Sequence, residues 1–129
     1  LLNVARINPA GAEKLRAFVQ AGGGLGLFVG DQVDIDQYNQ TLENPSIGLL
    51  PAPLIRRKRP VETAAGEQGD LRTEGHPLFE LFTGERNSFL QTVTIEEYIT
   101  LDETKMSPAS IVAARHRDRS PIWIDTPVG

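Results

Sequence analysis

AGGGLGLFVGD, residues 21–31 of this chain, is the stretch that decides its fold. Gly22 predicts the end of a helix, because glycine readily adopts the left-handed conformation that closes one. The apolar run at residues 25–29 is typical of a strand covered by helices on both faces. Gly30 and Asp31 then turn the chain out of that strand. In an open α/β sheet, ligands and active sites lie at the carboxyl ends of strands, so the stretch also predicts where a site lies.

A helix is expected directly before this stretch. Asn8 suits its N-cap and Pro9 its first position. The apolar residues that share one helical face are Ala12, Leu15, Phe18 and Val19. Residues 1–7 have the composition of a strand, so residues 1–29 predict a strand–helix–strand unit. Such a unit has parallel strands and a right-handed crossover.

The middle of the chain predicts a second helix and two irregular segments. Asp34 can cap a helix at residues 35–42. Prolines and a glycine interrupt residues 47–55, which predicts an irregular apolar segment packed on the core. Residues 61–75 are polar and contain glycine, which predicts an exposed loop within the domain.

The last third predicts short elements and a hairpin. Pro77 opens a short amphipathic helix at residues 76–82, and residues 90–101 are rich in strand-forming side chains. Residues 111–115 and 121–125 flank a polar turn, as the two strands of an antiparallel hairpin do.

Composition limits the classes of function. The 129 residues suit one domain, carry a net charge of −4 and contain no cysteine. The charge gives no broad attraction for nucleic acid or anionic lipid, so we expect neither as a partner. The lack of cysteine excludes disulfides, thiolate metal sites and thiol nucleophiles. No apolar run approaches the ~20 residues that span a bilayer, so we expect no membrane insertion by this segment.

The beginning and end of the chain suggest a fragment. It starts on Leu1 without an initiator methionine and ends on Gly129. We therefore expect residues 1–129 to be a single domain truncated at both ends, with other domains of a parent protein as partners. Exposed sheet edges left by truncation would also allow a homodimer. The compartment is not fixed by the sequence.

LRAFVQAGGGLGLFVGD, residues 15–31, resembles the class I glutamine amidotransferase-like superfamily. The order continues with Tyr38-Asn39, LLPAPL at residues 49–54 and HPLF at residues 76–79, and a hairpin closes the chain. This order is similar to a subgroup of large bacterial membrane-associated proteins that also carry aerotolerance-type or von Willebrand A-like domains. The resemblance implies a flavodoxin-like three-layer α/β fold with a parallel βαβ core, followed here by an antiparallel C-terminal hairpin.

The resemblance also implies a loss of catalysis. Catalytic members hold a cysteine in the turn after the central strand, and it attacks the glutamine amide with help from a histidine and an acid. This chain has Gly30-Asp31 in that turn and no cysteine anywhere. A serine substitute is not predicted, since no serine stands in a Gly-x-Ser-x-Gly context.

Asp31 and His76 are the candidate site residues. A carboxylate at the turn can act as base, nucleophile or cation ligand, and a convergent histidine would complete an acid–base couple. The competing interpretations are that Asp31 caps its own turn through backbone N–H groups and that His76 has a local role before Pro77. His116, close to the hairpin tip, is expected to be solvated.

Other motifs predict structure rather than chemistry. The aspartates at positions 31, 34 and 36 lack the glycine and glutamate of a calcium loop, so no metal site is predicted. The glycines do not match a phosphate loop, so no cofactor is predicted. The basic run at residues 56–59 is expected to be a solvated strand end or an inter-domain contact. Trp123 alternates with isoleucines and should face the opposite side, where it could contact the rest of a parent protein.

Three hypotheses follow. The first is a non-catalytic amidotransferase-like domain that serves as an interaction or ligand-sensing module of a larger bacterial protein. The alternative is a hydrolase that uses Asp31 with a histidine or a metal at the strand-end cleft. The third is a binder of carbohydrate or another small polar ligand at the same strand ends.

Overall fold

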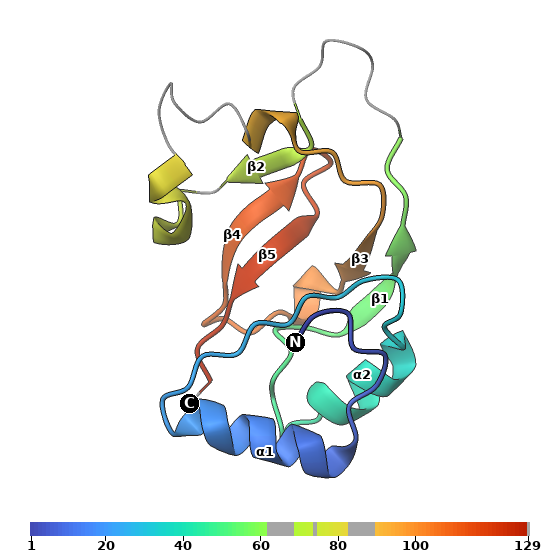
Figure 1. Cartoon of the computed structure of the whole chain (residues 1–129), viewed down its shortest axis with the longest axis vertical. Coiled ribbons are helices and arrows are strands. Elements are labelled where there is room, and N and C mark those ends of the chain that lie inside the picture. Colours follow the sequence, from blue (N-terminus) through green and yellow to red (C-terminus); the bar gives the residue numbers. More distant parts are fainter. Residues whose placement is uncertain (62–68, 74, 83–89, 129) are drawn as a thin grey trace.

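The computed structural model describes residues 1–61, 69–73, 75–82 and 90–128 of the chain. Within these residues the domain is mixed α/β, with two α-helices and two antiparallel sheets (Figure 1). The helices are α1 (Pro9–Gln20) and α2 (Ile35–Leu42), with short 3-10 helices η1 (Pro77–Phe82), η2 (Leu90–Thr92) and η3 (Glu103–Lys105). The strands are β1 (Leu54–Lys58), β2 (Leu71–Thr73), β3 (Tyr98–Leu101), β4 (Ile111–His116) and β5 (Pro121–Asp125).

The strands form one two-stranded and one three-stranded sheet. β1 pairs with β3, and the second sheet has the order β2-β4-β5. Every one of these pairings is antiparallel. The hairpin predicted for the C-terminal third is confirmed as β4 and β5, whereas the pairing of β1 with β3 joins segments far apart in sequence.

The end of α1 is built as the glycine pattern predicts. Gly22 has a φ of +97°, in the left-handed region. Its N–H donates to the carbonyl of Val19 at 2.9 Å, and the N–H of Gly23 donates to Phe18 at 3.0 Å. These two bonds form a Schellman motif, which satisfies carbonyls that the helix itself leaves open.

The two helix starts are also confirmed. The side chain of Asn8 accepts a hydrogen bond from the Gly11 N–H at 2.7 Å. The Asp34 carboxylate accepts from the Gln37 N–H at 3.1 Å at the start of α2. Each side chain thereby satisfies one of the open N–H groups of its first turn.

The expected parallel strand pair is reduced to one bridge. Leu2 and Phe28 form an isolated parallel bridge, in which the Phe28 N–H donates to Leu1 at 2.9 Å and the Asn3 N–H to Phe28 at 2.7 Å. The prediction of a central strand covered on both faces at residues 25–29 is wrong, because Phe28 is 50% exposed. Glycines within the stretch weaken a strand, since they add backbone entropy and no packing side chain. The side chains that reach the core from it are Leu25, Leu27 and Val29.

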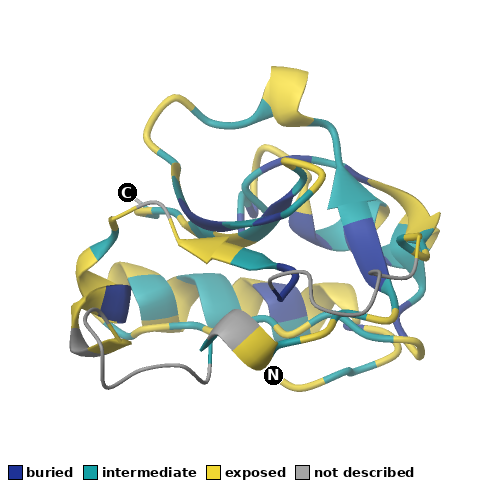
Figure 2. Cartoon of the chain, turned by 90° about the horizontal axis from the view of Figure 1, so that it is seen from above, coloured by how far each residue is buried: buried dark blue, intermediate teal, exposed yellow. Residues whose placement is uncertain are grey.

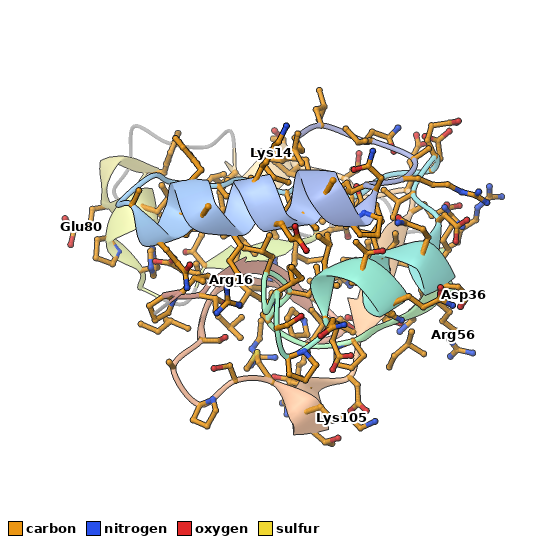
Figure 3. The ribbon with its side chains drawn as sticks, turned by 90° about the horizontal axis from the view of Figure 1, so that it is seen from below. Lys14, Arg16, Asp36, Arg56, Glu80 and Lys105 are labelled. Carbon is orange, nitrogen blue, oxygen red and sulfur yellow. The ribbon has the colours of Figure 1, made fainter. Side chains whose placement is uncertain are left out.

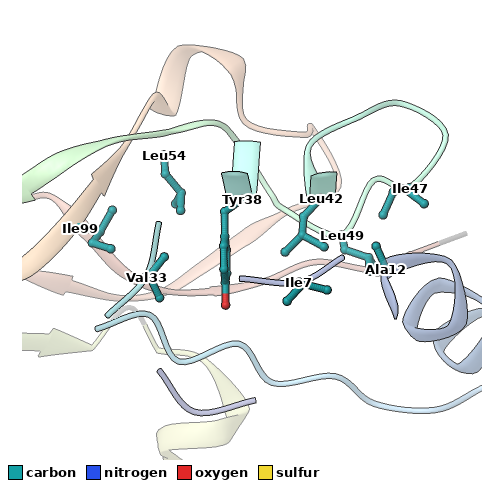
Figure 4. Packing of buried hydrophobic residues seen from close by; sticks show 9 residues of the cluster. All are labelled: Ile7, Ala12, Val33, Tyr38, Leu42, Ile47, Leu49, Leu54 and Ile99. Atoms are coloured by element: carbon teal, nitrogen blue, oxygen red, sulfur yellow. The ribbon is translucent and has the colours of Figure 1, made fainter. Parts of the chain in front are cut away.

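The main core lies between the helices, the residue 47–54 segment and β3 (Figure 4). Tyr38 and Leu42, on one face of α2, are almost completely buried in it. The Tyr38 hydroxyl donates to the carbonyl of Val4 at 2.6 Å, which ties α2 to the N-terminal segment. The other buried members of this cluster are Ile7, Ala12, Val33, Ile47, Leu49, Leu54 and Ile99. The prediction that residues 47–55 pack on the core is confirmed, although Leu54 already begins β1.

Charged side chains on α1 divide between the two sides of the helix. Arg16 reaches toward the neighbouring segment, where its guanidinium donates to the carbonyl of Ile47, whereas Lys14 points away (Figure 3). Buried residues gather in the interior between helices and strands, and the periphery is exposed (Figure 2).

The prediction of an exposed loop at residues 61–75 is wrong for residues 69–73, whereas residues 61 and 75 are exposed and lie outside the strands. Asp70 is only 4% exposed, and β2 follows it and pairs with β4. Residues 62–68 and 74 lie outside the described residues. Sequence composition does not show this strand, because β2 has only three residues and is defined by its backbone pairing with β4.

Candidate functional site

Asp31 lies in the predicted turn and is held by two amide side chains. Asn3 donates from Nδ2 to Asp31 Oδ1 at 2.8 Å, and Gln32 donates from Nε2 to Oδ2 at 3.0 Å. Asn3 Oδ1 in turn accepts the Gln32 backbone N–H at 3.0 Å. A Cβ at Gly30 would lie 2.7 Å from Asn3 Oδ1, so glycine at this position lets the Asn3 amide approach.

These bonds set the charge of Asp31. The hydrogen bond from Asn3, followed by that from Gln32, lowers the pKa of the exposed carboxyl below its ordinary value. Hydrogen bonds to the charged form have this effect because they stabilise the ionised carboxylate. Asp31 is therefore an ionised acceptor near neutral pH and a weak general base.

Asp31 stands at one wall of an open cleft of about 1090 Å³. The cleft is lined by residues 29–31, 59–61 and 94–99 together with Asp70. Its charged lining residues are Asp31, Arg59, Asp70, Glu96 and Glu97. Among the described lining residues, four therefore carry a carboxylate and one carries a guanidinium.

The basic run at residues 56–59 forms ion pairs within the chain. Arg59 lies 2.8 Å from Glu97, and Lys58 lies 2.5 Å from Asp118. Arg57 donates to the backbone carbonyls of Asp31 and Val33 at 2.9 and 2.5 Å, which fixes the turn against β1. Three of the four basic side chains of the run therefore bind other segments of the chain to β1, which is largely exposed.

His76 and Asp31 have different partners. His76 Nδ1 accepts the Leu78 N–H at 3.2 Å, and its Nε2 lies 3.4 Å from Asp125 Oδ2. The local role of His76 at the start of η1 is therefore confirmed. No hydrogen bond or ion pair between described residues joins it to Asp31.

Sequence reasoning missed the buried histidine. His116 was expected to be solvated, but this is wrong: its side chain is 1% exposed. Nδ1 lies 3.0 Å from Asp118 Oδ1, and Nε2 lies 3.9 Å from Asp70 Oδ1. The Tyr98 ring stacks on the imidazole, with a centroid separation of 5.1 Å. The alternation of β4 carries the missed signal, since His116 is two residues beyond the fully buried Ala114 and faces the same side.

Asp118 connects this histidine to β1, to β3 and to the turn between β4 and β5. Its Oδ2 accepts from the Tyr98 hydroxyl at 2.5 Å and from Lys58, and its Oδ1 accepts from the Ser120 N–H at 2.9 Å. Partial burial by itself raises the pKa of Asp118. The hydrogen bonds from Lys58, Tyr98 and Ser120 outweigh it and bring the pKa far below the ordinary range. Burial is also the main cause of the raised pKa of Tyr98, so its hydroxyl stays a proton donor.

Trp123 occupies the opposite face, as its alternation with the isoleucines predicts. Its ring makes edge contacts with Phe28 at 5.8 Å and Phe79 at 5.9 Å between centroids. It remains 39% exposed. Its contact with other domains stays a prediction.

Comparison of the chain with protein-family models, with curated proteins and with solved structures gave no match. The described residues contain no group of three or more histidine, aspartate or glutamate side chains placed to hold a metal ion. Across the same part of the chain, none of the helices combines the length and apolarity needed to cross a bilayer. Fold and site geometry thus define a small mixed α/β domain with an acidic cleft.

Proposed function

We propose that this chain is a non-catalytic, amidotransferase-like module of a larger bacterial protein and that it senses a ligand in the cleft beside Asp31. The proposal includes a flavodoxin-like arrangement in which residues 1–3 run parallel to and alongside the segment at residues 25–29. The parallel bridge between Leu2 and Phe28 and the Schellman motif before it support this arrangement.

The state of Asp31 is the observation that carries the proposal. On the resemblance, this carboxylate takes the place of the nucleophile of the catalytic enzymes, and amides from Asn3 and Gln32 keep it ionised. An acid–base couple needs a second titratable group beside the carboxylate. Asn3 and Gln32 do not supply one, because a side-chain amide does not titrate near neutral pH.

The cleft favours a ligand with cationic or amino groups. Arg59 and Arg57 approach Glu97, and Arg117 pairs with Asp70 at 2.9 Å. Asp31 is held by neutral amides, so its charge is directed to the cleft. A cleft lined mainly by charges of one sign raises the local concentration of ligands of the opposite sign.

The hydrolase alternative gains no support from these contacts. Both histidines have other partners: His76 pairs with Asp125, and His116 is enclosed by Asp70 and Asp118. Neither imidazole is hydrogen-bonded to Asp31 in the described residues.

Binding and turnover can be tested on the intact chain with two variants. Asp31→Asn removes the cleft charge, and Asp36→Asn removes the same charge from the exposed side of α2 as a matched control. Spermidine and L-arginine are titrated against ¹⁵N-labelled protein, and ammonia release from L-glutamine is measured in parallel.

We expect saturable amide shifts at residues 29–31 and 94–99, weaker binding in Asp31→Asn, unchanged binding in Asp36→Asn and no ammonia release. Glutamine turnover that is lost in Asp31→Asn and kept in Asp36→Asn would overturn the non-catalytic assignment. Absence of cleft shifts with both cationic probes would refute the ligand-sensing role.

A further inference from the structure

The imidazole of His116 is enclosed between two carboxylates with one nitrogen left without a partner. Nδ1 lies 3.0 Å from Asp118 Oδ1. Nε2 is buried, makes no hydrogen bond within the described part of the chain and lies 3.9 Å from Asp70 Oδ1. Buried polar atoms are nearly always hydrogen-bonded, so this exception calls for an explanation.

Neither neutral form of the ring satisfies both nitrogens. A neutral imidazole has one N–H and one lone pair. If Nδ1 accepts the Asp118 backbone N–H, which lies at 3.2 Å, the proton sits on Nε2 and points at an oxygen beyond hydrogen-bond distance. If Nδ1 carries the proton and donates to Asp118 Oδ1, the Nε2 lone pair faces the Asp70 carboxylate. Only the protonated ring offers a donor to each carboxylate.

The surroundings of the ring are charged and drawn from several elements. Asp70 precedes β2, and Arg117 and Asp118 belong to the turn between β4 and β5. Arg117 Nε pairs with Asp70 Oδ1 at 2.9 Å, and Lys58 of β1 pairs with Asp118 at 2.5 Å. Tyr98 of β3 covers the ring face and donates its hydroxyl to Asp118. Among the described residues, the two carboxylates thus contact Arg117 and Lys58 as well as one ring whose charge can change.

This group is mechanically linked to the cleft. Asp70 Oδ2 accepts the Ile95 backbone N–H at 2.7 Å. Asp70, Ile95 and Tyr98 all line the cleft. A hydrogen bond from Nε2 needs Asp70 Oδ1 to approach by about 1 Å, from 3.9 Å to an ordinary N–H···O distance. Asp70 would carry Ile95 with it, because the two are bonded directly.

We propose that His116 is a proton-controlled switch in the cleft wall. Protonation lets the ring bridge Asp118 and Asp70 and draws Ile95 toward β4, while loss of the proton releases Asp70 from the ring. Histidine is the side chain suited to this role, since its charge ordinarily changes between about pH 5 and 8. The consequence for ligand binding rests on the proposed function, whereas the movement of the wall does not.

The switch is tested by NMR on the ligand-free chain between about pH 5 and 8.5, a range around the histidine window. The imidazole nitrogens of His116 and the backbone amide of Ile95 are followed together. We expect both to titrate with one midpoint. His76→Gln, which removes the other histidine, should leave that titration unchanged, and His116→Gln should abolish it at Ile95.

In the unmodified chain, either of two results would overturn the switch: an Ile95 amide that stays fixed while His116 changes its charge, or a His116 ring that keeps one charge across the range. An Ile95 titration that survives in His116→Gln would assign the movement to another group and also refute it. If His116→Gln does not fold, co-titration in the unmodified chain and in His76→Gln still decides. No ligand is used, so failure of this test is separate from failure of the proposed function.

Discussion

Replacing Gly22 by alanine tests the stretch that decides the fold. Gly22 has a φ of +97°, and a Cβ built on it meets no atom within 4 Å. The cost of Gly22→Ala is therefore conformational rather than steric. A left-handed backbone costs an L-residue about 1–2 kcal/mol.

Gly24→Ala is the matched control. Its Cβ also meets no atom within 4 Å, and its φ lies outside the left-handed region. Both substitutions reduce the entropy of the unfolded chain by a similar amount, roughly 0.4–1 kcal/mol in favour of folding. This contribution cancels in the comparison, so the two variants should differ by the left-handed penalty alone, about 1–2 kcal/mol.

Thermal unfolding followed by circular dichroism converts this difference into a temperature. An unfolding entropy of about 2.1 cal/mol/K per residue over 129 residues gives roughly 0.27 kcal/mol/K. Gly22→Ala should then melt about 4–7 °C below Gly24→Ala. Melting temperatures within about 1 °C of each other would refute the assignment of Gly22 as the left-handed helix end.

Three further predictions concern the core, the Tyr98 hydroxyl and acid stability. Leu42→Ala should lower the free energy of unfolding by about 2–5 kcal/mol in urea titrations, because Leu42 is completely buried, whereas Leu78→Ala, 45% exposed, should change it by less than about 1 kcal/mol. Tyr98→Phe should lower the free energy of unfolding by about 1.5–3 kcal/mol, because the hydroxyl donates to a carboxylate. Tyr38→Phe should lower it by only about 0.5–1.5 kcal/mol, because the acceptor is a neutral carbonyl. Equal losses in the two variants would contradict a charged acceptor for Tyr98. The carboxyls of Asp34, Asp102 and Asp118 have lower pKa values in the folded than in the unfolded chain. Their contribution to the free energy of unfolding is therefore present above about pH 4 and is lost as the pH falls further. Urea titrations from about pH 6 to pH 2 should show this loss of stability, and a free energy of unfolding that does not change with pH would disprove it.

Local chemistry explains which elements could be predicted. Asn8 and Asp34 cap their helices through contacts three residues away, so residue type and spacing suffice to place both helix starts. The hairpin of β4 and β5 is equally local. A two-residue periodicity and a polar turn determine it without reference to the rest of the chain.

Long-range pairing explains what could not be predicted. β1 pairs with β3 across the middle of the sequence, and β2 becomes a strand because β4 offers it a partner. Side-chain composition does not record such partners, since strand preference depends on context. Asp31 was placed correctly in its turn, but the Asn3 amide that holds it comes from the N-terminal segment. The burial of His116 likewise depends on Tyr98 and Asp70, which are distant in sequence.

The carboxylates of this domain differ in what they are able to do because their partners differ. Asp118 and Asp70 are tied by cations and hydrogen bonds to several strands, so they can transmit a change of charge on His116 but have little capacity left for a ligand. The exposed Asp31 carboxylate accepts hydrogen bonds from the neutral amides of Asn3 and Gln32, and on the proposed function its charge attracts a ligand. A carboxylate that is paired with a cation of the same chain stabilises the fold, whereas a carboxylate without such a pair can attract a cationic ligand from solution. On the two proposals, aspartate serves ligand recognition at residue 31 and coupling to His116 at residues 70 and 118.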